Sequence, residues 1–275
     1  MNLLTARQAA PLRHGLAVAV HATLAALTTG AALAADDDNI VTDRPDFVES
    51  SAVVGKGRLQ VETSVAFDRS RIDGGVERAT SMPTLLRVGV SDTIEVRVET
   101  DGRMHSWTRA GGGGSDARGY GDTAIGLKWH AQDARGNAPS MGVLVHADLA
   151  TGSKAFRRQG VRPSLRVVGE WELPGDLALG VMPGIASQTG ADGKRFASGI
   201  FGIVLGKQWG ERFRSFVEIS APQIARGRNG GSQFSFDAGV AYLVTNRCQL
   251  DTALARGLNR NTPDLSWTVG LSVKL

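Results

Sequence analysis

The residues of this sequence that could do chemistry are charged side chains that alternate with apolar ones. Residues 93–101 read TIEVRVETD, in which three apolar residues alternate with four charged ones. Successive side chains of a β-strand point to opposite faces, so this segment predicts a strand with one apolar and one charged face. Acids and bases that share a face can pair with one another, which is electrostatic rather than covalent chemistry.

A catalytic arrangement is the alternative for one of these strands. His146 and Asp148 are two residues apart, so a strand would place both side chains on the same face, where they could act as an acid–base pair. A hydrolase also needs a nucleophile beside its base, and no G-x-S-x-G or other nucleophile motif accompanies them. We therefore interpret them as an ordinary polar pair and predict no catalytic residue.

Cofactor and metal motifs are also weak. Cys248 is the one cysteine, which excludes an internal disulfide and a cysteine-cluster metal site. Beyond residue 34 the histidines are His105, His130 and His146, which we expect at different heights of the fold, so no shared metal site is predicted. Residues 119–124 fit the G-x-G-x-x-A dinucleotide motif but open a strand instead of a helix, so no cofactor is predicted.

The first 34 residues have the pattern of a cleaved secretory signal peptide. Arg7 and Arg13 precede a short apolar stretch at residues 16–33, and residues 32–34 read Ala-Leu-Ala, a small-residue cleavage site. No apolar run of 18 residues follows, so the sequence predicts no transmembrane helix. Loss of the two arginines lowers the net charge from +4 to +2, which argues against a nucleic-acid binder.

Alternating segments follow one another along the rest of the chain. Glycine, at 35 of 275 residues against a usual share of about 7%, favours many turns and small inward positions over long helices. We predict twelve strands, each close to the length of about 9–11 residues that a tilted strand needs to cross a bilayer. They are residues 57–68, 80–90, 93–101, 121–130, 140–149, 161–172, 177–185, 197–208, 213–220, 233–243, 248–256 and 264–275.

Long and short connections alternate between these strands. The short ones are residues 91–92, 131–139, 174–176, 210–212 and 245–247, and the long polar loops are residues 69–79, 102–120, 150–160, 186–196, 221–232 and 257–263. Bacterial outer-membrane barrels have short periplasmic turns and longer outer loops. The fold class predicted is therefore all-β, a single antiparallel up-and-down transmembrane barrel over residues 57–275 with periplasmic N- and C-termini, preceded by a periplasmic segment at residues 35–56.

The direction of each face depends on the surroundings of the barrel. A soluble barrel hides its apolar face, whereas a membrane barrel turns it to lipid and keeps polar side chains inside. The leader, the even strand number and the alternating loops favour the membrane. The predicted lumen-lining residues are Glu95, Arg97, Glu99, Asp122, Lys128, His146, Asp148, Arg162, Arg166, Glu170, Arg214 and Glu218, with Glu62, Arg87, Asp237 and Asp251 in the same inward set.

Two further features fit an outer-membrane location. Trp129, Trp171 and Trp209 each end a strand beside a short turn, where an interfacial aromatic girdle would lie. The final strand, with Thr268, Gly270, Val273 and the terminal Leu275, is similar to the C-terminal signal of bacterial barrels, except that the usual last residue is aromatic. The expected partners are outer-membrane lipid, lipopolysaccharide and the barrel-insertion machinery, with no nucleic acid.

Two motifs carry a family resemblance. Residues 42–62, TDRPDFVESSAVVGKGRLQVE, resemble the start of the mature chain in the outer-membrane family named for the MetA pathway of phenol degradation, and residues 121–129, GDTAIGLKW, resemble an internal strand of it. The resemblance implies an outer-membrane barrel more firmly than a solute. Within the first motif (Thr42, Asp43, Arg44, Pro45, Asp46 and Phe47), the charged residues together with Glu49 are expected either to form an ion-pair knot at the periplasmic mouth or to plug it.

The function predicted is an outer-membrane channel for passive diffusion of small solutes, aromatic or hydrophobic ones included. Twelve strands lie between the eight that pack shut and the sixteen that leave an open aqueous channel, so side chains and in-folded loops must set the bore. The first alternative is a closed structural or ligand-binding barrel without conductance, and the second is an outer-membrane barrel hydrolase.

Overall fold

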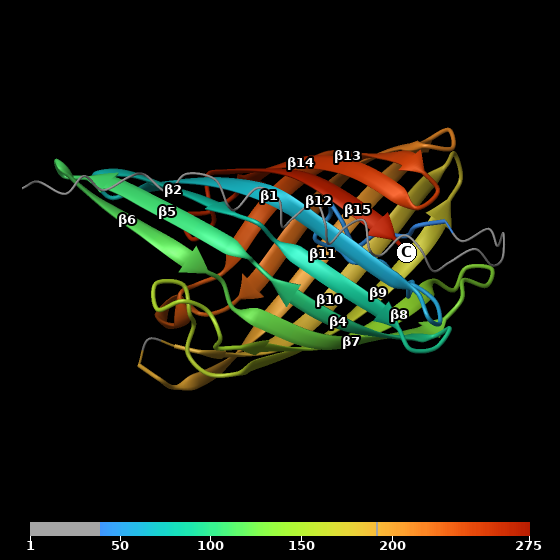
Figure 1. The fold of residues 1–275 in the computed structure, drawn as a ribbon, viewed down its shortest axis with the longest axis horizontal. Coiled ribbons are helices and arrows are strands. Elements are labelled where there is room, and N and C mark those ends of the chain that lie inside the picture. Colours follow the sequence, from blue (N-terminus) through green and yellow to red (C-terminus); the bar gives the residue numbers. More distant parts are fainter. Residues whose placement is uncertain (1–38, 191) are drawn as a thin grey trace, which may run out of the picture. The chain divides into compact units, whose positions relative to one another are not determined.

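Twelve strands form the wall of one closed antiparallel barrel in the computed structural model, which describes residues 39–190 and 192–275 (Figure 1). The predicted signal peptide lies outside these residues. The wall strands are β1 (Leu59–Ile72), β3 (Thr84–Gly89), β4 (Ile94–Thr100), β7 (Thr123–Gln132), β8 (Ser140–Leu149), β9 (Arg162–Leu173), β10 (Leu177–Thr189), β11 (Arg195–Trp209), β12 (Phe213–Ile224), β13 (Gln233–Thr245), β14 (Cys248–Gly257) and β15 (Leu265–Lys274). The predicted all-β barrel of twelve strands is confirmed.

Pairing of the first and last strands closes the wall and leaves it no free edge. β1 runs antiparallel to β15, with Val61 opposite Val273 and Phe67 opposite Trp267. The rings of Phe67 and Trp267 stack on the outer face with centroids 5.6 Å apart. Leu59 and Leu275 exchange backbone hydrogen bonds, so the barrel begins and ends at the same rim.

The two faces of the wall have opposite chemistry. On β4, Val96 and Val98 are each 38% exposed on the outside, whereas Glu95 and Arg97 are 0% and 1% exposed on the inside. The same inversion continues onto β7, where Leu127 is exposed and Lys128 is buried. An apolar outside and a charged inside fit a lipid environment, so the alternation describes a membrane barrel. Among the described residues, no helix is long and apolar enough to cross a membrane.

Short and long connections lie at opposite rims. The rim where the barrel begins and ends, here called the turn rim, has the tight connections between β3 and β4, β9 and β10, β11 and β12, and β13 and β14. The other, the loop rim, has the connection between β8 and β9, and the one between β12 and β13, which contains the 3₁₀ helix η1 (Gly227–Asn229). The predicted loops at residues 186–196 and 221–232 are shorter than expected, because β10 continues to Thr189 and β12 to Ile224.

Two of the predicted loops are wrong, because residues 69–79 and 102–120 are largely strands. The distal half of β1 pairs with β2 (Gly75–Ser81), β2 with β5 (Arg103–Ala110), and β5 with β6 (Gly113–Tyr120). These strands form a sheet that projects beyond the barrel, here called the extension (Figure 1). Gly111 and Gly112 have φ of 56° and 83°, as a tight hairpin turn requires at both central positions. Met82 and Pro83 separate β2 from β3, so the predicted strand 80–90 is two strands.

Candidate functional site

Residues 39–56, here called the lumen segment, fold back into the barrel from the turn rim. Near its start, the Ile40 N–H donates to the Asn246 carbonyl at 2.7 Å, in the turn between β13 and β14. At its end, the Gly57 N–H donates to the Gly89 carbonyl at 2.9 Å, beside the turn between β3 and β4. Between these two anchors, residues 43–51 contact inner side chains from both sides of the wall, so the segment crosses the lumen.

Three cations of the wall converge on one carboxylate of the segment. Asp43 accepts an ion pair from Arg97 at 2.6 Å, from Lys128 at 2.8 Å and from Arg87 at 3.5 Å. Arg87 also binds Glu62 and Glu95, each at 2.9 Å. All three cations are almost wholly buried, so these pairs are screened little by solvent. This part of the lumen, formed by β1, β3, β4 and β7, is called the charged side below.

The other charged residues of the segment also pair with the wall. Glu49 binds Arg97 at 2.8 Å and Arg166 at 2.6 Å. Arg214 holds Asp46 with two hydrogen bonds, at 2.8 and 2.9 Å. The predicted plug therefore describes the arrangement better than a knot among the motif's own residues, because each of these carboxylates finds its partner on the wall.

Carboxylates of the wall bind the backbone of the segment. Glu218 accepts the N–H groups of Phe47 and Val48 at 2.8 and 2.7 Å. Glu170 accepts the N–H of Ser51 at 2.6 Å, and Glu95 accepts that of Val54 at 2.9 Å. A segment without secondary structure must pair its buried N–H groups somewhere, and these inner carboxylates satisfy them.

Apolar side chains line the opposite part of the lumen. Val48 packs in a buried cluster on β8–β12, called the apolar side below, which consists of Leu144, Val168, Met182, Val204 and Phe216. Glycines make room there: a Cβ at Gly202 would lie 2.6 Å from Cγ2 of Val48, and one at Gly180 would lie 3.1 Å from its Cγ1. Part of the glycine excess thus serves small inward positions, as the composition indicated.

The lumen segment borders two cavities. One, of about 690 Å³, reaches the turn rim and is lined by Thr42, Val48 and Ser50 of the segment together with residues of β9–β12. The other, of about 520 Å³, lies toward the loop rim and is lined by Phe47, Glu49 and the wall residues around Arg162. Asp46 borders both. The segment thus separates two water-accessible chambers.

At the loop rim, one carboxylate ties a loop to the wall. Asp122, just before β7, accepts the N–H groups of Gly152 and Arg158 at 2.9 and 3.1 Å, and pairs with Arg162 at 3.2 Å. Burial alone would raise the pKa of Asp122, but these hydrogen bonds and the arginine hold it below its usual value. The loop between β8 and β9 is therefore fixed beside the second cavity.

The predicted lumen-lining residues fall into two groups by burial. Buried inside the wall are Glu95, Arg97, Lys128, His146, Arg162 and Glu218, and half-buried are Glu99, Asp122, Asp148, Arg166, Glu170 and Arg214. Pairing between His146 and Asp148 does not occur: the imidazole Nδ1 lies 3.4 Å from Glu99, while Asp148 lies 3.8 Å from Arg162. The predicted acid–base pair is therefore not assembled.

The sequence analysis predicted neither the three cations that surround Asp43 nor the apolar cluster around Val48. The charged strands were recognised from their alternation, but which strands face the segment depends on the closed wall and its register. The inward Leu144, at 0% exposure, lies on a strand where Val143 and Val145 are also apolar, so the alternation there is masked.

Two solved structures share the barrel architecture of this chain. An outer-membrane channel from Pseudomonas putida F1 is 13% identical and has a TM-score of 0.58, over 84% of this chain and 99% of that one. The β domain of the Bordetella autotransporter BrkA is 13% identical and has a TM-score of 0.50, over 78% of this chain and 98% of that one. No curated protein matches the sequence.

The family comparison covers most of the lumen segment and the whole wall. The family described as "Putative MetA-pathway of phenol degradation" matches residues 42–275, from the first residue of the TDRPDF motif to the last residue of the chain. The predicted resemblance is confirmed, and the fold indicates the outer membrane. The chain belongs to this family of outer-membrane β-barrels.

Proposed function

We propose that the protein is an outer-membrane channel for passive diffusion of small solutes, and that the lumen segment must move before it conducts. The observation that carries this proposal is the pair of cavities on either side of the segment. A barrel built only for structure would have no need of water-accessible chambers at both rims. Twelve strands give a lumen wide enough to hold a chain segment, so a passage opens when that segment leaves.

The chemistry of the lumen suits small amphiphilic solutes. Once the segment has moved away, the charged side would offer ion-pairing groups, and the apolar side would offer the side chains that pack around Val48, among them Met182 and Phe216. An aromatic or hydrophobic solute, such as the family description suggests, could contact the apolar side while its polar groups face the charged side. The Pseudomonas relative is described as a channel, which agrees with this proposal.

A tether between segment and wall tests the proposed movement. The hydroxyls of Ser51 and Ser140 lie 2.7 Å apart, one on the segment and one at the start of β8. We would replace both with cysteine in a Cys248→Ser background, and record single-channel currents in a planar bilayer under oxidising and reducing conditions. The single variant Ser51→Cys in the same background is the matched control.

The expected result is that oxidation abolishes the channel openings of the double variant and that reduction restores them. The control should show the same openings under both conditions. Equal conductance of the oxidised and reduced double variant, with the cross-link verified by mass spectrometry, would show that the segment need not move. If no form of the protein conducts, the channel proposal fails. A closed structural barrel would then be the better description, and the many buried ion pairs of the segment favour that alternative.

The orientation, the leader and the partners are part of the same proposal. We place the turn rim in the periplasm and the extension outside the cell, after removal of residues 1–34, with lipid and lipopolysaccharide around the wall and insertion by the barrel-assembly machinery. Cysteines at Gly113, Gly190 or Gly230 should then react with an impermeant reagent on intact cells. Cysteines at Asp92, Gly175 or Asn246 should react only after the outer membrane is opened; the opposite pattern would reverse the orientation.

We assign the protein no enzymatic activity. The acid–base pair considered from the sequence, His146 with Asp148, is not assembled, because His146 faces Glu99 and Asp148 lies 3.8 Å from Arg162. An esterase assay on refolded protein addresses the hydrolase alternative directly, and turnover abolished by His146→Gln would support it.

A further inference from the structure

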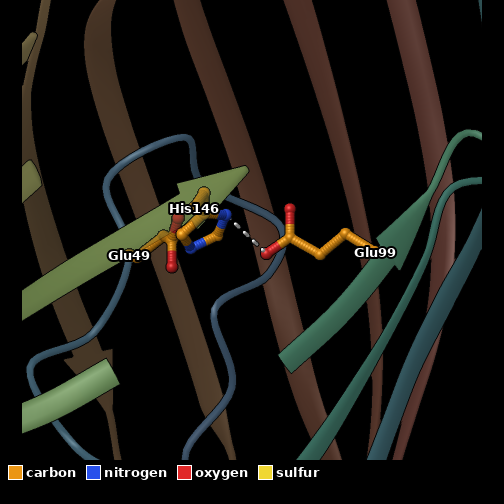
Figure 2. A group of neighbouring side chains, drawn as sticks. All are labelled: Glu49, Glu99 and His146. Carbon is orange, nitrogen blue, oxygen red and sulfur yellow. Dashed lines mark ion pairs between the residues drawn. The ribbon is translucent and has the colours of Figure 1, made fainter. Parts of the chain in front are cut away.

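Three side chains from the segment and the wall meet beside the charged side. They are Glu49 of the lumen segment, Glu99 of β4 and His146 of β8, and Figure 2 shows the imidazole between the two carboxylates. One possible ligand atom of each residue lies within 4.8 Å of those of the other two. We propose that these three residues bind a divalent transition-metal cation such as Zn²⁺.

The state of His146 is the observation that points to a ligand. The residue is 2% exposed, and neither ring nitrogen has a hydrogen-bond partner among the described residues. Its Nδ1 faces Oε1 of Glu99 at 3.4 Å without hydrogen-bond geometry. A neutral imidazole nitrogen with a free lone pair and a carboxylate oxygen repel each other when nothing lies between them. A cation bound by both removes that repulsion and satisfies a buried polar group.

The separations suit a shared ion. Two ligands that each lie about 2.1 Å from a tetrahedral zinc ion are about 3.4 Å apart, which is the spacing of His146 Nδ1 and Glu99 Oε1. The ligand atom of Glu49 lies within 4.8 Å of the other two, so it needs to move by at most about 1.4 Å, the difference between 4.8 and 3.4 Å, which rotation of its side chain provides. The ring itself is placed by packing against Gly126, where a Cβ would lie only 3.0 Å from Cδ2 of His146. Three protein ligands leave a fourth position for water.

The surrounding charges favour an added cation. The ion pairs around Asp43 and Glu49 form one connected network with five carboxylates and four cations. They are Asp43, Glu49, Glu62, Glu95 and Glu99 against Arg87, Arg97, Lys128 and Arg166. With all five carboxylates ionised, this largely buried network carries one net negative charge, so a cation beside Glu49 and Glu99 lowers its energy.

The two arginines at the site leave room for a metal. Arg97 binds Glu49 and Glu99 at 2.8 and 2.9 Å, and Arg166 binds Glu49 at 2.6 Å. Arg97 donates to Oε1 of Glu99 from Nη2 and Nε, at 2.9 and 3.2 Å, and a small rotation of this carboxylate presents Oε2 to a metal beside His146. A carboxylate has about four lone-pair positions, so it can accept an arginine and coordinate a metal together. Partners of this kind orient ligating carboxylates in known metal sites. Glu49 and Glu99 also line the cavity of about 520 Å³, which gives an ion its path of entry.

The ligand set favours transition metals and would fix the segment. An imidazole nitrogen suits Zn²⁺, Ni²⁺ or Cu²⁺, whereas Mg²⁺ and Ca²⁺ prefer oxygen ligands alone. Because Glu49 belongs to the lumen segment and the other two ligands belong to the wall, a bound ion joins the segment to the wall. The site can be tested without any assumption about conductance.

The experiment is a Zn²⁺ titration by calorimetry on tag-free protein refolded in detergent, with Mg²⁺ and Ca²⁺ as competitors. We expect one Zn²⁺ per chain, at least tenfold weaker binding in His146→Gln and in Glu99→Gln, and unchanged binding in His105→Ala. His105 is the matched control, because it lies on β5 in the extension and pairs with Asp116 instead. Circular dichroism establishes that each variant is folded.

A rise in the thermal unfolding temperature with Zn²⁺, present in the wild type and absent in Glu99→Gln, would add support. The proposal is overturned if folded His146→Gln binds Zn²⁺ as the wild type does, or if Mg²⁺ displaces the ion at equal concentration. It is also overturned if the wild type binds no Zn²⁺, since His146 would then be satisfied by a proton or by water.

Discussion

The lumen segment lies between two surfaces that hold it by different physics. On the charged side, Arg87, Arg97 and Lys128 surround Asp43 with ion pairs of 2.6 to 3.5 Å. On the apolar side, Val48 packs among aliphatic and aromatic side chains above Gly180 and Gly202. The first kind of contact depends on direction and on every partner being present, whereas the second depends mainly on the apolar area that is buried.

This difference has an energetic consequence. Removal of one partner from a buried ion pair leaves the other charge without compensation, which costs more than the pair itself contributes. Removal of methyl groups from an apolar contact costs their transfer free energy and a small cavity. The charged side should therefore determine where the segment sits, while the apolar side adds stability in a graded way.

The largest effect is expected for Arg97→Met. Arg97 is 1% exposed and lies within 3.4 Å of Asp43, Glu49, Glu95 and Glu99, so its loss leaves three buried carboxylates and the half-buried Glu99 short of a partner. We expect the free energy of unfolding to fall by about 3–5 kcal/mol, measured by urea titration in detergent. The control is Arg109→Met on the exposed face of the extension, which should change stability little. Similar losses in both variants would contradict the charged side's role.

A smaller loss, about 3 kcal/mol, is expected for Asp43→Asn, because Lys128 and two arginines lose their common anion. Combination with Lys128→Met should cost less than the sum of the single changes, by a coupling of about 1–3 kcal/mol. The measurement is a double-mutant cycle of unfolding free energies. Strict additivity would mean that the pair does not act as a unit.

Val48→Ala tests the other surface. It removes two methyl carbons from the cluster around Met182 and Phe216, so we expect a loss of about 1.5–2 kcal/mol. In planar-bilayer recordings the variant should open more often than the wild type but less often than Asp43→Asn. A ranking in which Val48→Ala opens the channel more would reverse the comparison and make the apolar side the principal anchor.

The sequence predicts the wall well, for a simple reason. A strand between lipid and a charged lumen must alternate, and that alternation is written in residues such as those of β4 and β15. The extension carries no such signal, because no residue of β5 or β6 is buried and β6 is rich in glycine and polar residues. The prediction of loops at residues 69–79 and 102–120 failed for that reason: strands held mainly by their own backbone hydrogen bonds need no hydrophobic period.

The site was less accessible to sequence reasoning. The charged residues of the TDRPDF motif and the inward wall residues could each be named, but their pairing spans large separations, such as Asp43 with Lys128 and Asp46 with Arg214. Those contacts depend on closure of the barrel and on the re-entrant path of the segment. The alternation in a strand shows on which face each side chain lies, but it does not show which residue of another strand or segment faces that side chain across the lumen.

The smallest effect on stability is expected from the loss of an arginine–carboxylate ion pair that is exposed to solvent, Arg71 with Asp264. At the loop rim, Arg71 of β1 donates from its side chain to Oδ1 of Asp264 at 3.0 and 3.1 Å, and its backbone N–H also donates to that carboxylate. Hydrogen bonds from the Arg71 side chain and backbone lower the pKa of Asp264 from its usual value. A lowered pKa means that the contact contributes above the usual pKa and is lost as the pH falls through the lower folded value.

We therefore expect that at pH 7 the Asp264→Asn variant exchanges the backbone amides near Arg71 slightly faster than the wild type. The two proteins should become equal as the pH falls below the usual range of an aspartate. Hydrogen exchange followed by mass spectrometry, with both proteins compared at each pH, cancels the intrinsic pH dependence of exchange. A difference that persists in acid would mean that the side-chain amide, rather than lost charge, perturbs the rim. A loss of global stability comparable to that of Asp43→Asn would show that burial is not what separates the charged side from an exposed ion pair.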